Sequence, residues 1–298
     1  TSHRAGRWLV GGIAGCAVLF AAVAPWLMIR PAFDPPYREA VPARAAATDA
    51  AFEGGMRLAG YLAPVDAITP GESFPLTAYW QATKALDEHL TAWVHLTPAD
   101  PTARIAEETR WLGGTLYPSE YWRAGDVVAQ PTTLAAPTWA SAPALVWARI
   151  GLLDTNGHRI SLADGSGDAV VLDPWRVRPI ESPPGPTHAR EVVFGDPALI
   201  ALRGYDLATI DTSLTVTFTW AARAVPPQDY TVFVHLVDGE GELLAQDDAP
   251  PNAGRYPTSW WLPGDVIRDP HTLPLPGTPT AGWELRVGLY DPATDTRL

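Results

Sequence analysis

The chain has 298 residues, a net charge of −12, 47% hydrophobic residues and 18% charged residues. This balance is that of a chain that buries cores, and the length suits about two domains. The negative charge argues against a nucleic-acid partner, which would require a basic surface. The single cysteine, Cys16, excludes an internal disulfide and a cysteine-based zinc site.

The N-terminal stretch, residues 1–30, is predicted to hold a transmembrane helix with a short flank. Residues 8–29 form an uncharged run of 22 residues, which as a helix spans about 33 Å, enough for a hydrocarbon core of about 30 Å. A buried helix would show a polar face, and a cleaved signal peptide has a shorter apolar core. Arg4 and Arg7 precede the run, so we expect a cytoplasmic N-terminus and extracytoplasmic domains on a bacterial cell membrane.

The remaining chain divides into two copies of one pattern, placed at residues 52–178 and 190–298. A Pro/Ala-rich linker is expected at residues 31–51 and a Pro-rich linker at residues 179–189. Seven landmarks recur in order, and their offset drifts from 144 residues (Gly60 to Gly204) to 137 (Gly151 to Gly288). In the first copy they are Gly60-Tyr61, Leu76 to Trp80, Trp93 to Leu96, Tyr117 to Ser119, Trp122, Gly125 to Val127, and Gly151 to Asp154.

Each copy consists of short alternating runs separated by turn signals such as Asn156-Gly157. In Thr231 to Leu236, for example, Val232, Val234 and Leu236 share one face of a strand. No helical period follows residue 30. We therefore predict an all-β fold with two tandem Ig-like β-sandwich domains behind the membrane helix.

The second copy is expected to lack its last strand. The first copy continues beyond Ile160 through an apolar run that ends at residues 169–178, whereas the second copy ends at Leu298, which aligns with Ile160. Because proteins seldom leave a strand edge open, we expect at least one strand fewer in the second copy and a native chain that continues beyond Leu298.

Six repeated residues are candidate site positions. They are His95, Trp122, Asp126, His235, Trp261 and Asp265. The two histidines suit a metal or a general base only with partners nearby, and no other histidine recurs, so we interpret them as structural. The two Trp residues are expected to pin a loop onto each sandwich, and the two Asp residues to cap a turn.

Three further aromatic residues, Trp111, Trp139 and Trp260, are the candidate ligand-binding residues because they lack repeat equivalents and could stack on sugar rings. The competing interpretation is core packing. The acidic run at residues 238–248 lacks the Gly and Glu of a calcium loop. No catalytic or phosphate-binding motif appears, so we predict no catalytic residues, no metal and no cofactor.

Several runs in the second copy carry a resemblance to a known family. They are Asp229 to Leu236, Ala245 to Asp248, Tyr256 to Trp261, Pro263 to Val266, and Gly288 to Asp291. These runs resemble the C-terminal extracytoplasmic region of bacterial, Chloroflexi-type membrane glycosyltransferases of the family 39 or dolichyl-phosphate-mannose mannosyltransferase-like kind. In that family a last membrane helix, a Pro-rich stretch and β domains follow in this order.

The resemblance implies a non-catalytic module accessory to cell-surface glycan transfer. The family's catalytic acidic residues lie among many membrane helices, which have no counterpart here, so none is carried over. One alternative is a carbohydrate-binding or cell-surface interaction module on a single anchor, with a glycan or glycolipid partner. Exposed aromatic residues at equivalent places in both copies would favour it. The other alternative is a hydrolase, which would need two carboxylates about 5–10 Å apart.

Overall fold

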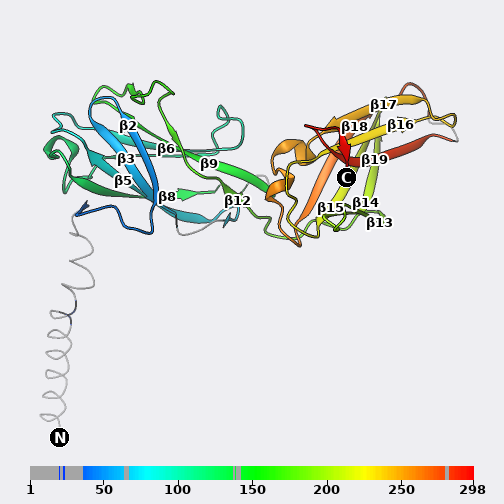
Figure 1. The fold of residues 1–298 in the computed structure, drawn as a ribbon, viewed down its shortest axis with the longest axis horizontal. Coiled ribbons are helices and arrows are strands. Elements are labelled where there is room, and N and C mark those ends of the chain that lie inside the picture. Colours follow the sequence, from blue (N-terminus) through cyan, green and yellow to red (C-terminus); the bar gives the residue numbers. More distant parts are fainter. Residues whose placement is uncertain are drawn as a thin grey trace, which may run out of the picture.

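The computed structural model describes residues 20, 23, 36–63, 67–136, 138, 142–278 and 282–298. These residues form an all-β chain with two units, each built from two sheets around one core (Figure 1). The predicted membrane helix at residues 8–29 lies outside the described residues, apart from Phe20 and Val23. Within the described part of the chain, no helix is long and apolar enough to cross a membrane.

The first unit contains strands β1 to β12. One sheet has the order β1-β8-β5-β3-β2, and the other has the order β4-β12-β9-β6-β7, with β10 and β11 also paired to β9. The strands are β1 (Tyr37–Arg38), β2 (Ala46–Phe52), β3 (Met56–Leu62), β4 (Ala67–Ile68), β5 (Ser73–Ala82), β6 (Thr91–Thr97), β7 (Ala106–Trp111), β8 (Val127–Ala135), β9 (Ala144–Leu153), β10 (Arg159–Ile160), β11 (Val170–Val171) and β12 (Trp175–Val177).

The second unit contains strands β13 to β20. Its sheets have the orders β13-β14-β15-β18 and β17-β16-β19-β20. The strands are β13 (His188–Phe194), β14 (Ile200–Ile210), β15 (Ser213–Ala222), β16 (Thr231–Val237), β17 (Leu243–Ala249), β18 (Val266–Pro274), β19 (Glu284–Asp291) and β20 (Thr296–Arg297). Short 3-10 helices are η2 (Ser119–Tyr121), η3 (Pro251–Gly254) and η4 (Thr258–Trp260).

The repeat in the sequence corresponds to a repeat of strand order and register. β2, β3, β5 and β8 are matched by β13, β14, β15 and β18, while β7, β6, β9 and β10 are matched by β17, β16, β19 and β20. His95 lies opposite Arg149 on β9, and His235 lies opposite Arg286 on β19. Residues can therefore be compared between the units position by position.

Two boundaries differ from those expected. Residues 31–51 were predicted to be a linker, but β1 pairs with β8 and β2 begins at Ala46 and pairs with β3. Similarly, β13 begins at His188, inside the expected linker at residues 179–189. Both β2 and β13 are edge strands. Backbone pairing with one neighbour holds an edge strand, so its sequence needs little apolar alternation.

The second unit has eight strands in the described residues, against twelve in the first. Strands β1, β4, β11 and β12 have no counterpart there. The last two matter most, because β11 and β12 both pair with β9 on the side away from β6. Over the described residues, the matching side of β19 is paired only from Leu289 to Asp291: the Leu298 N–H donates to the Leu289 carbonyl at 2.9 Å, and Tyr290 and Asp291 pair with β20.

The units are joined by a small number of direct contacts. The Leu145 N–H donates a hydrogen bond of 2.8 Å to the Arg255 carbonyl. The side-chain amide of Asn252 donates a hydrogen bond of 3.0 Å to the Pro143 carbonyl. The Leu145 side chain is 2% exposed and packs in the core of the second unit, although it belongs to β9 of the first.

Candidate binding groove in the second unit

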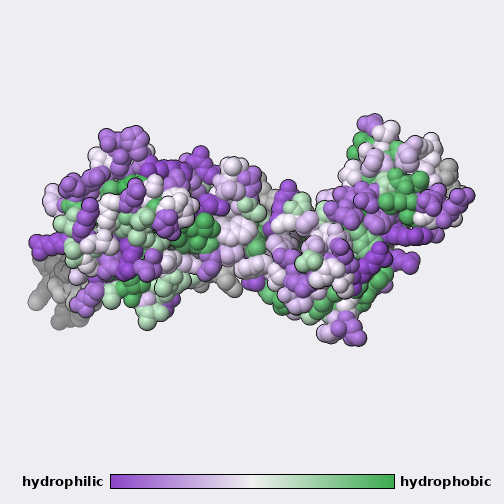
Figure 2. Space-filling model, turned by 45° about the horizontal axis from the view of Figure 1, so that its top comes forward, coloured by the Kyte–Doolittle hydropathy of each residue, from purple (hydrophilic) through white to green (hydrophobic). Residues whose placement is uncertain are grey.

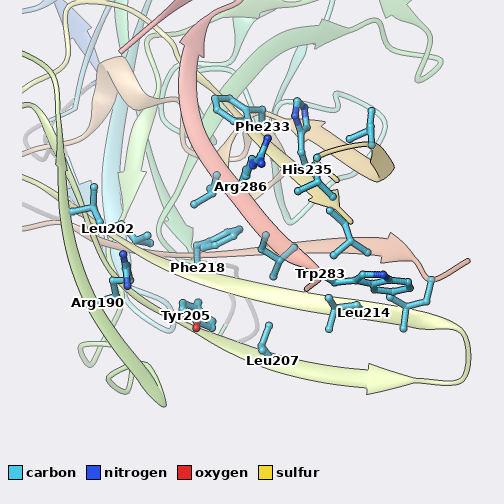
Figure 3. Close-up of a pocket in the computed structure, with 18 of the residues that line it drawn as sticks. Arg190, Leu202, Tyr205, Leu207, Leu214, Phe218, Phe233, His235, Trp283 and Arg286 are labelled. Atoms are coloured by element: carbon cyan, nitrogen blue, oxygen red, sulfur yellow. The ribbon is translucent and has the colours of Figure 1, made fainter. Parts of the chain in front are cut away.

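A groove of about 1020 Å³ opens in the second unit between the β14–β15 hairpin and β19 (Figure 3). Apolar side chains dominate its lining. They include Leu207, Leu214, Phe218, Trp283, Leu285 and Val287. In the space-filling view, apolar atoms gather beside the hollow of this unit, on the right (Figure 2). The groove is therefore an apolar recess that reaches the surface.

Strand periodicity places these side chains. Tyr205 and Leu207 are two residues apart on β14, so they share one face, and Leu214 and Phe218 share a face of β15 in the same way. Leu207 remains 46% exposed. This face of the hairpin would be covered in a closed sandwich, and here it borders open space.

In the first unit, the space equivalent to the groove is filled by the segment that carries β11 and β12. Leu172, Trp175 and Val177, from the segment that carries β11 and β12, are at most 2% exposed and belong to the core. The Trp175 ring lies 5.3 Å from that of Phe74, the residue at the β5 position that Leu214 occupies on β15. A pocket of about 230 Å³ lies beside Trp175.

Residues of β9 and β19 that face the space between the two sheets differ in burial between the units. Ala148 and Ile150 on β9 are fully buried, at 0% exposure. Their register equivalents on β19, Leu285 and Val287, are only half-buried. The groove therefore lies at the position that the segment with β11 and β12 occupies in the first unit.

The rim of the groove is basic. Arg190, Arg286 and Arg297 line it, and no Asp or Glu occurs among its described lining residues, although Glu284 beside the groove forms an ion pair of 3.6 Å with Arg286. The Arg297 guanidinium lies 4.8 Å from the centre of the Phe233 ring. Such a recess favours a ligand that is apolar and carries negative charge.

The equivalent arginine of the first unit has an acidic partner. Arg159 lies 4.3 Å from the centre of the Trp93 ring and forms a 2.9 Å ion pair with Asp168. Asp168 lies just before β11, in the segment without a counterpart in the second unit. Among the described residues, Arg297 has no ion pair of this kind.

The repeated Trp residues fasten a loop in each unit. Trp122 and Trp261 are at most 1% exposed. Their indole N–H groups donate to the carbonyls of Tyr117 and Tyr256 at 2.7 and 2.8 Å. A buried indole with a satisfied N–H is a packing element.

The repeated Asp residues complete the same loop. The Tyr117 hydroxyl donates to Asp126, and the Tyr256 hydroxyl donates to Asp265 at 2.7 Å. Burial, and then the hydrogen bond to Asp126, raise the pKa of Tyr117 to about 12. Burial and Asp265 also raise the pKa of Tyr256. Each Tyr–Asp pair, together with the buried Trp of its unit, forms one structural bracket that holds the loop.

The repeated histidines lie on the outer face of the β6–β9 and β16–β19 pairs. His95 Nε2 is 3.9 Å from Glu107, and His235 Nε2 is 3.5 Å from Asp248. Burial is the main cause that lowers the pKa of His95. Across the described residues, no group of three His, Cys, Asp or Glu side chains could hold a metal ion. His235 lines the groove.

The three candidate aromatic residues do not converge. Trp111 on β7 is 58% exposed, Trp139 lies outside the described residues, and Trp260 on η4 is half-buried beneath Arg176, whose guanidinium is 5.1 Å from its ring. Trp260 ends η4 as Tyr121 ends η2, so it does have an aromatic equivalent, contrary to the sequence interpretation. Neither Trp111 nor Trp260 lines the groove.

The second unit contains a buried polar cluster that the first unit lacks at the equivalent positions. His271 and Asp269 are 1% exposed, and His271 contacts Asp269 at 3.0 Å and Asp247 at 3.2 Å. Asp269 also accepts the Trp220 indole N–H at 2.9 Å. Burial lowers the pKa of His271, but the hydrogen bonds and charges of the two carboxylates outweigh it, so the pKa is raised above 6.5.

The groove residues were not predicted from the sequence. Leu285 and Val287 have the alternation of ordinary core positions, although they are only half-buried. Two features of the sequence could have indicated the groove: residues 161–178 have no counterpart in the second copy, and Leu285 and Val287 align with Ala148 and Ile150.

Compared with models of protein families and with curated proteins, the chain matches none.

Proposed function

We propose that the chain is the non-catalytic, extracytoplasmic module of a membrane-anchored, glycosyltransferase-like protein, and that its second unit binds a ligand in the groove. One observation carries the ligand-binding role. Of two units with the same strand order, one fills the space beside its sheets and the other leaves an apolar, arginine-rimmed recess of about 1020 Å³. On this proposal the first unit is a support and the second unit is the binding unit.

The anchor and the parent activity rest on the sequence. The uncharged run at residues 8–29 supports a membrane helix, and the motif runs resembling membrane glycosyltransferases support a place beside glycan transfer. Alkaline carbonate extraction of bacterial membranes tests the anchor, since a spanning helix keeps the chain in the pellet. Coding sequence for many membrane helices upstream of residue 1 is the expected result for the parent transferase.

A carbohydrate-binding role is the second candidate. Trp111 and Tyr121 in the first unit are 58% and 66% exposed, as stacking platforms for sugars must be. However, the equivalent of Tyr121 is Trp260, which is half-buried beneath Arg176, so exposed aromatic residues do not recur at equivalent places. The groove is therefore the stronger candidate.

Binding of the anionic apolar dye 1-anilinonaphthalene-8-sulfonate tests the groove. We expect saturable binding that Leu207→Glu weakens at least tenfold, because this substitution places a negative charge on the groove wall. Ile210→Glu is the matched control, since Ile210 is on the same strand, is 67% exposed and does not line the groove. Equal dye binding by both variants would show that the groove is not the binding site.

A further inference from the structure

We propose that the first unit rests on the lipid surface of the membrane through a patch of exposed aromatic and aliphatic side chains, at the end where the chain enters this unit. The inference concerns a surface other than the groove, and it rests on the membrane anchor within the proposed function. The patch, called the entry patch, comprises Tyr37, Trp111, Leu116 and Tyr121, which are between 45% and 66% exposed.

The members of the entry patch share one end of the first unit. Tyr37 on β1 pairs with Val128 near the start of β8. The Tyr117 hydroxyl donates to Asp126, just ahead of β8, and lies 3.2 Å from the carbonyl oxygen of Tyr121. The chain (dark blue) thus enters the first unit beside η2, at the end away from the second unit (Figure 1).

The Trp111 ring is held in its exposed position by the neighbouring side chains. The His89 ring meets it edge-on at 4.9 Å between ring centres. His89 Nδ1 lies in turn 3.3 Å from a carboxylate oxygen of Glu120, the residue of η2 that precedes Tyr121. A large ring held outward in this way loses little conformational entropy when it is buried against a partner.

The second unit uses the equivalent end as an interface. Leu116 precedes the repeated tyrosine of its unit as Arg255 does in the second unit, and the Arg255 carbonyl accepts an N–H of β9 from the first unit at 2.8 Å. The equivalent of Tyr121 is Trp260, whose ring lies beneath Arg176 of the first unit. In the second unit, this end of the fold therefore contacts the part of the chain that precedes it.

The uncharged run at residues 8–29 is what precedes the first unit. Tyr37 follows the last residue of that run by eight positions, a length that reaches at most about 29 Å when fully extended. An anchored chain therefore holds the entry patch beside the bilayer surface. Trp and Tyr are favoured at the membrane–water interface, and the Leu116 side chain gains free energy by leaving water.

Other partners fit the entry patch less well. A sugar ring would stack on Trp111 or Tyr121 but would leave Leu116 in water. The end of the first unit that carries Leu145 and Arg176 is already covered by the second unit of the same chain, so a second copy cannot dock there as the two units do. Because the chain carries a net charge of −12, we expect contact with neutral headgroups and little dependence on salt.

Spin labelling of the full chain in phosphatidylcholine nanodiscs tests the contact. The single native cysteine allows one nitroxide at Cys16 or, in a Cys16→Ser background, at Leu116→Cys or Ile180→Cys. Ile180 is the control, since it is 69% exposed and follows β12 at the end that meets the second unit. Oxygen concentrates in the bilayer, whereas a nickel chelate stays in water. The ratio of oxygen to nickel accessibility should be at least about threefold higher at position 116 than at position 180.

A double substitution shows whether the aromatic rings hold the contact. Trp111→Ser with Tyr121→Ser should lower the accessibility ratio of the label at position 116 to that at position 180. Val225→Ser is the matched control, because Val225 is as exposed as Leu116 and belongs to the second unit, and it should leave the ratio unchanged. Both variants should keep the thermal unfolding temperature of the parent chain, since only exposed side chains are removed.

The outcomes separate this inference from the proposed function. A label at Cys16 that is open to the nickel chelate would overturn the anchor, and the surface contact with it. A label at Cys16 shielded within the bilayer, with equal ratios at positions 116 and 180, would overturn the surface contact alone. A label at position 116 shielded from both oxygen and nickel would identify a protein or glycan partner, and a ratio that falls in 0.5 M salt, about ten times the screening of dilute buffer, would identify a charge-based contact. Either result would overturn insertion of the entry patch into lipid.

Discussion

The two units have the same strand order and the same loop bracket, but they close their sandwiches differently. The first unit inserts Leu172, Trp175 and Val177 from its own chain. In the second unit, larger side chains fill part of the space, since Phe218 stands at the position of Ala78 and Leu285 at that of Ala148. Over the described residues, the first unit thus covers its two sheets with its own segment, whereas the second unit has a recess at the same position.

The largest expected effect concerns what the units share. Trp122→Ala and Trp261→Ala should each lower the free energy of unfolding by about 3–5 kcal/mol, because each deletes a fully buried indole. Trp111→Ala is the control, and its exposed ring should cost less than about 1 kcal/mol. Denaturant unfolding measures all three. A small loss for one buried Trp alone would show that the brackets are not equivalent.

Equivalent glycine-to-alanine substitutions should lower stability by different amounts in the two units. A Cβ on Gly151 would lie 2.5 Å from the backbone oxygen of Asp168 as well as against Trp93, whereas a Cβ on Gly288 would meet only the Phe233 ring. A ring can move more easily than the backbone just before β11, so Gly151→Ala should cost about 1–3 kcal/mol of stability and Gly288→Ala clearly less. Equal costs in thermal unfolding would mean that the segment with β11 does not constrain β9.

The pH dependence of stability should also differ between the units. The pKa of His271 is raised in the folded state, so its contribution is complete below about 6.5 and is lost as pH rises through the folded pKa. The slope for one proton is at most about 1.4 kcal/mol per pH unit. The first unit has Gln130 and Thr132 at the positions of Asp269 and His271, so it lacks this dependence.

Chemical denaturation between pH 6 and pH 9 measures this loss, with His271→Gln as the control. Gln retains hydrogen-bonding capacity but binds no proton, so the slope should flatten while the protein is less stable throughout. An unchanged slope in the variant would assign the titration to another group.

The smallest expected difference concerns the stacked arginines. Arg159→Ala should cost about 1 kcal/mol, because it removes both a cation–π contact and a partly exposed ion pair, while Arg297→Ala should cost about 0.5 kcal/mol. Raising the ionic strength should narrow the gap, since only Arg159 has the ion pair. A gap unaffected by salt would contradict that assignment.

The sequence predicted the repeated features and missed those that depend on an edge or a void. Trp122 and Trp261 could be placed because large side chains within ordered landmarks mark packing positions. The strand at Ala46–Phe52 was missed because its small side chains give no apolar alternation, and backbone pairing to β3 holds it. The groove was missed because Leu285 and Val287 alternate like ordinary core residues, although they are only half-buried.

Leu145, together with its β9 neighbour Trp147, makes the dependence between the units run in one direction. It is part of β9 in the first unit, yet its side chain completes the core of the second, and the described core of the first unit contains no residue from the second. During synthesis, the first unit can finish its interior while the second is still being made. A fragment beginning at residue 190 would start with a hole where Leu145 belongs, and any event that loosens β9 would weaken both units.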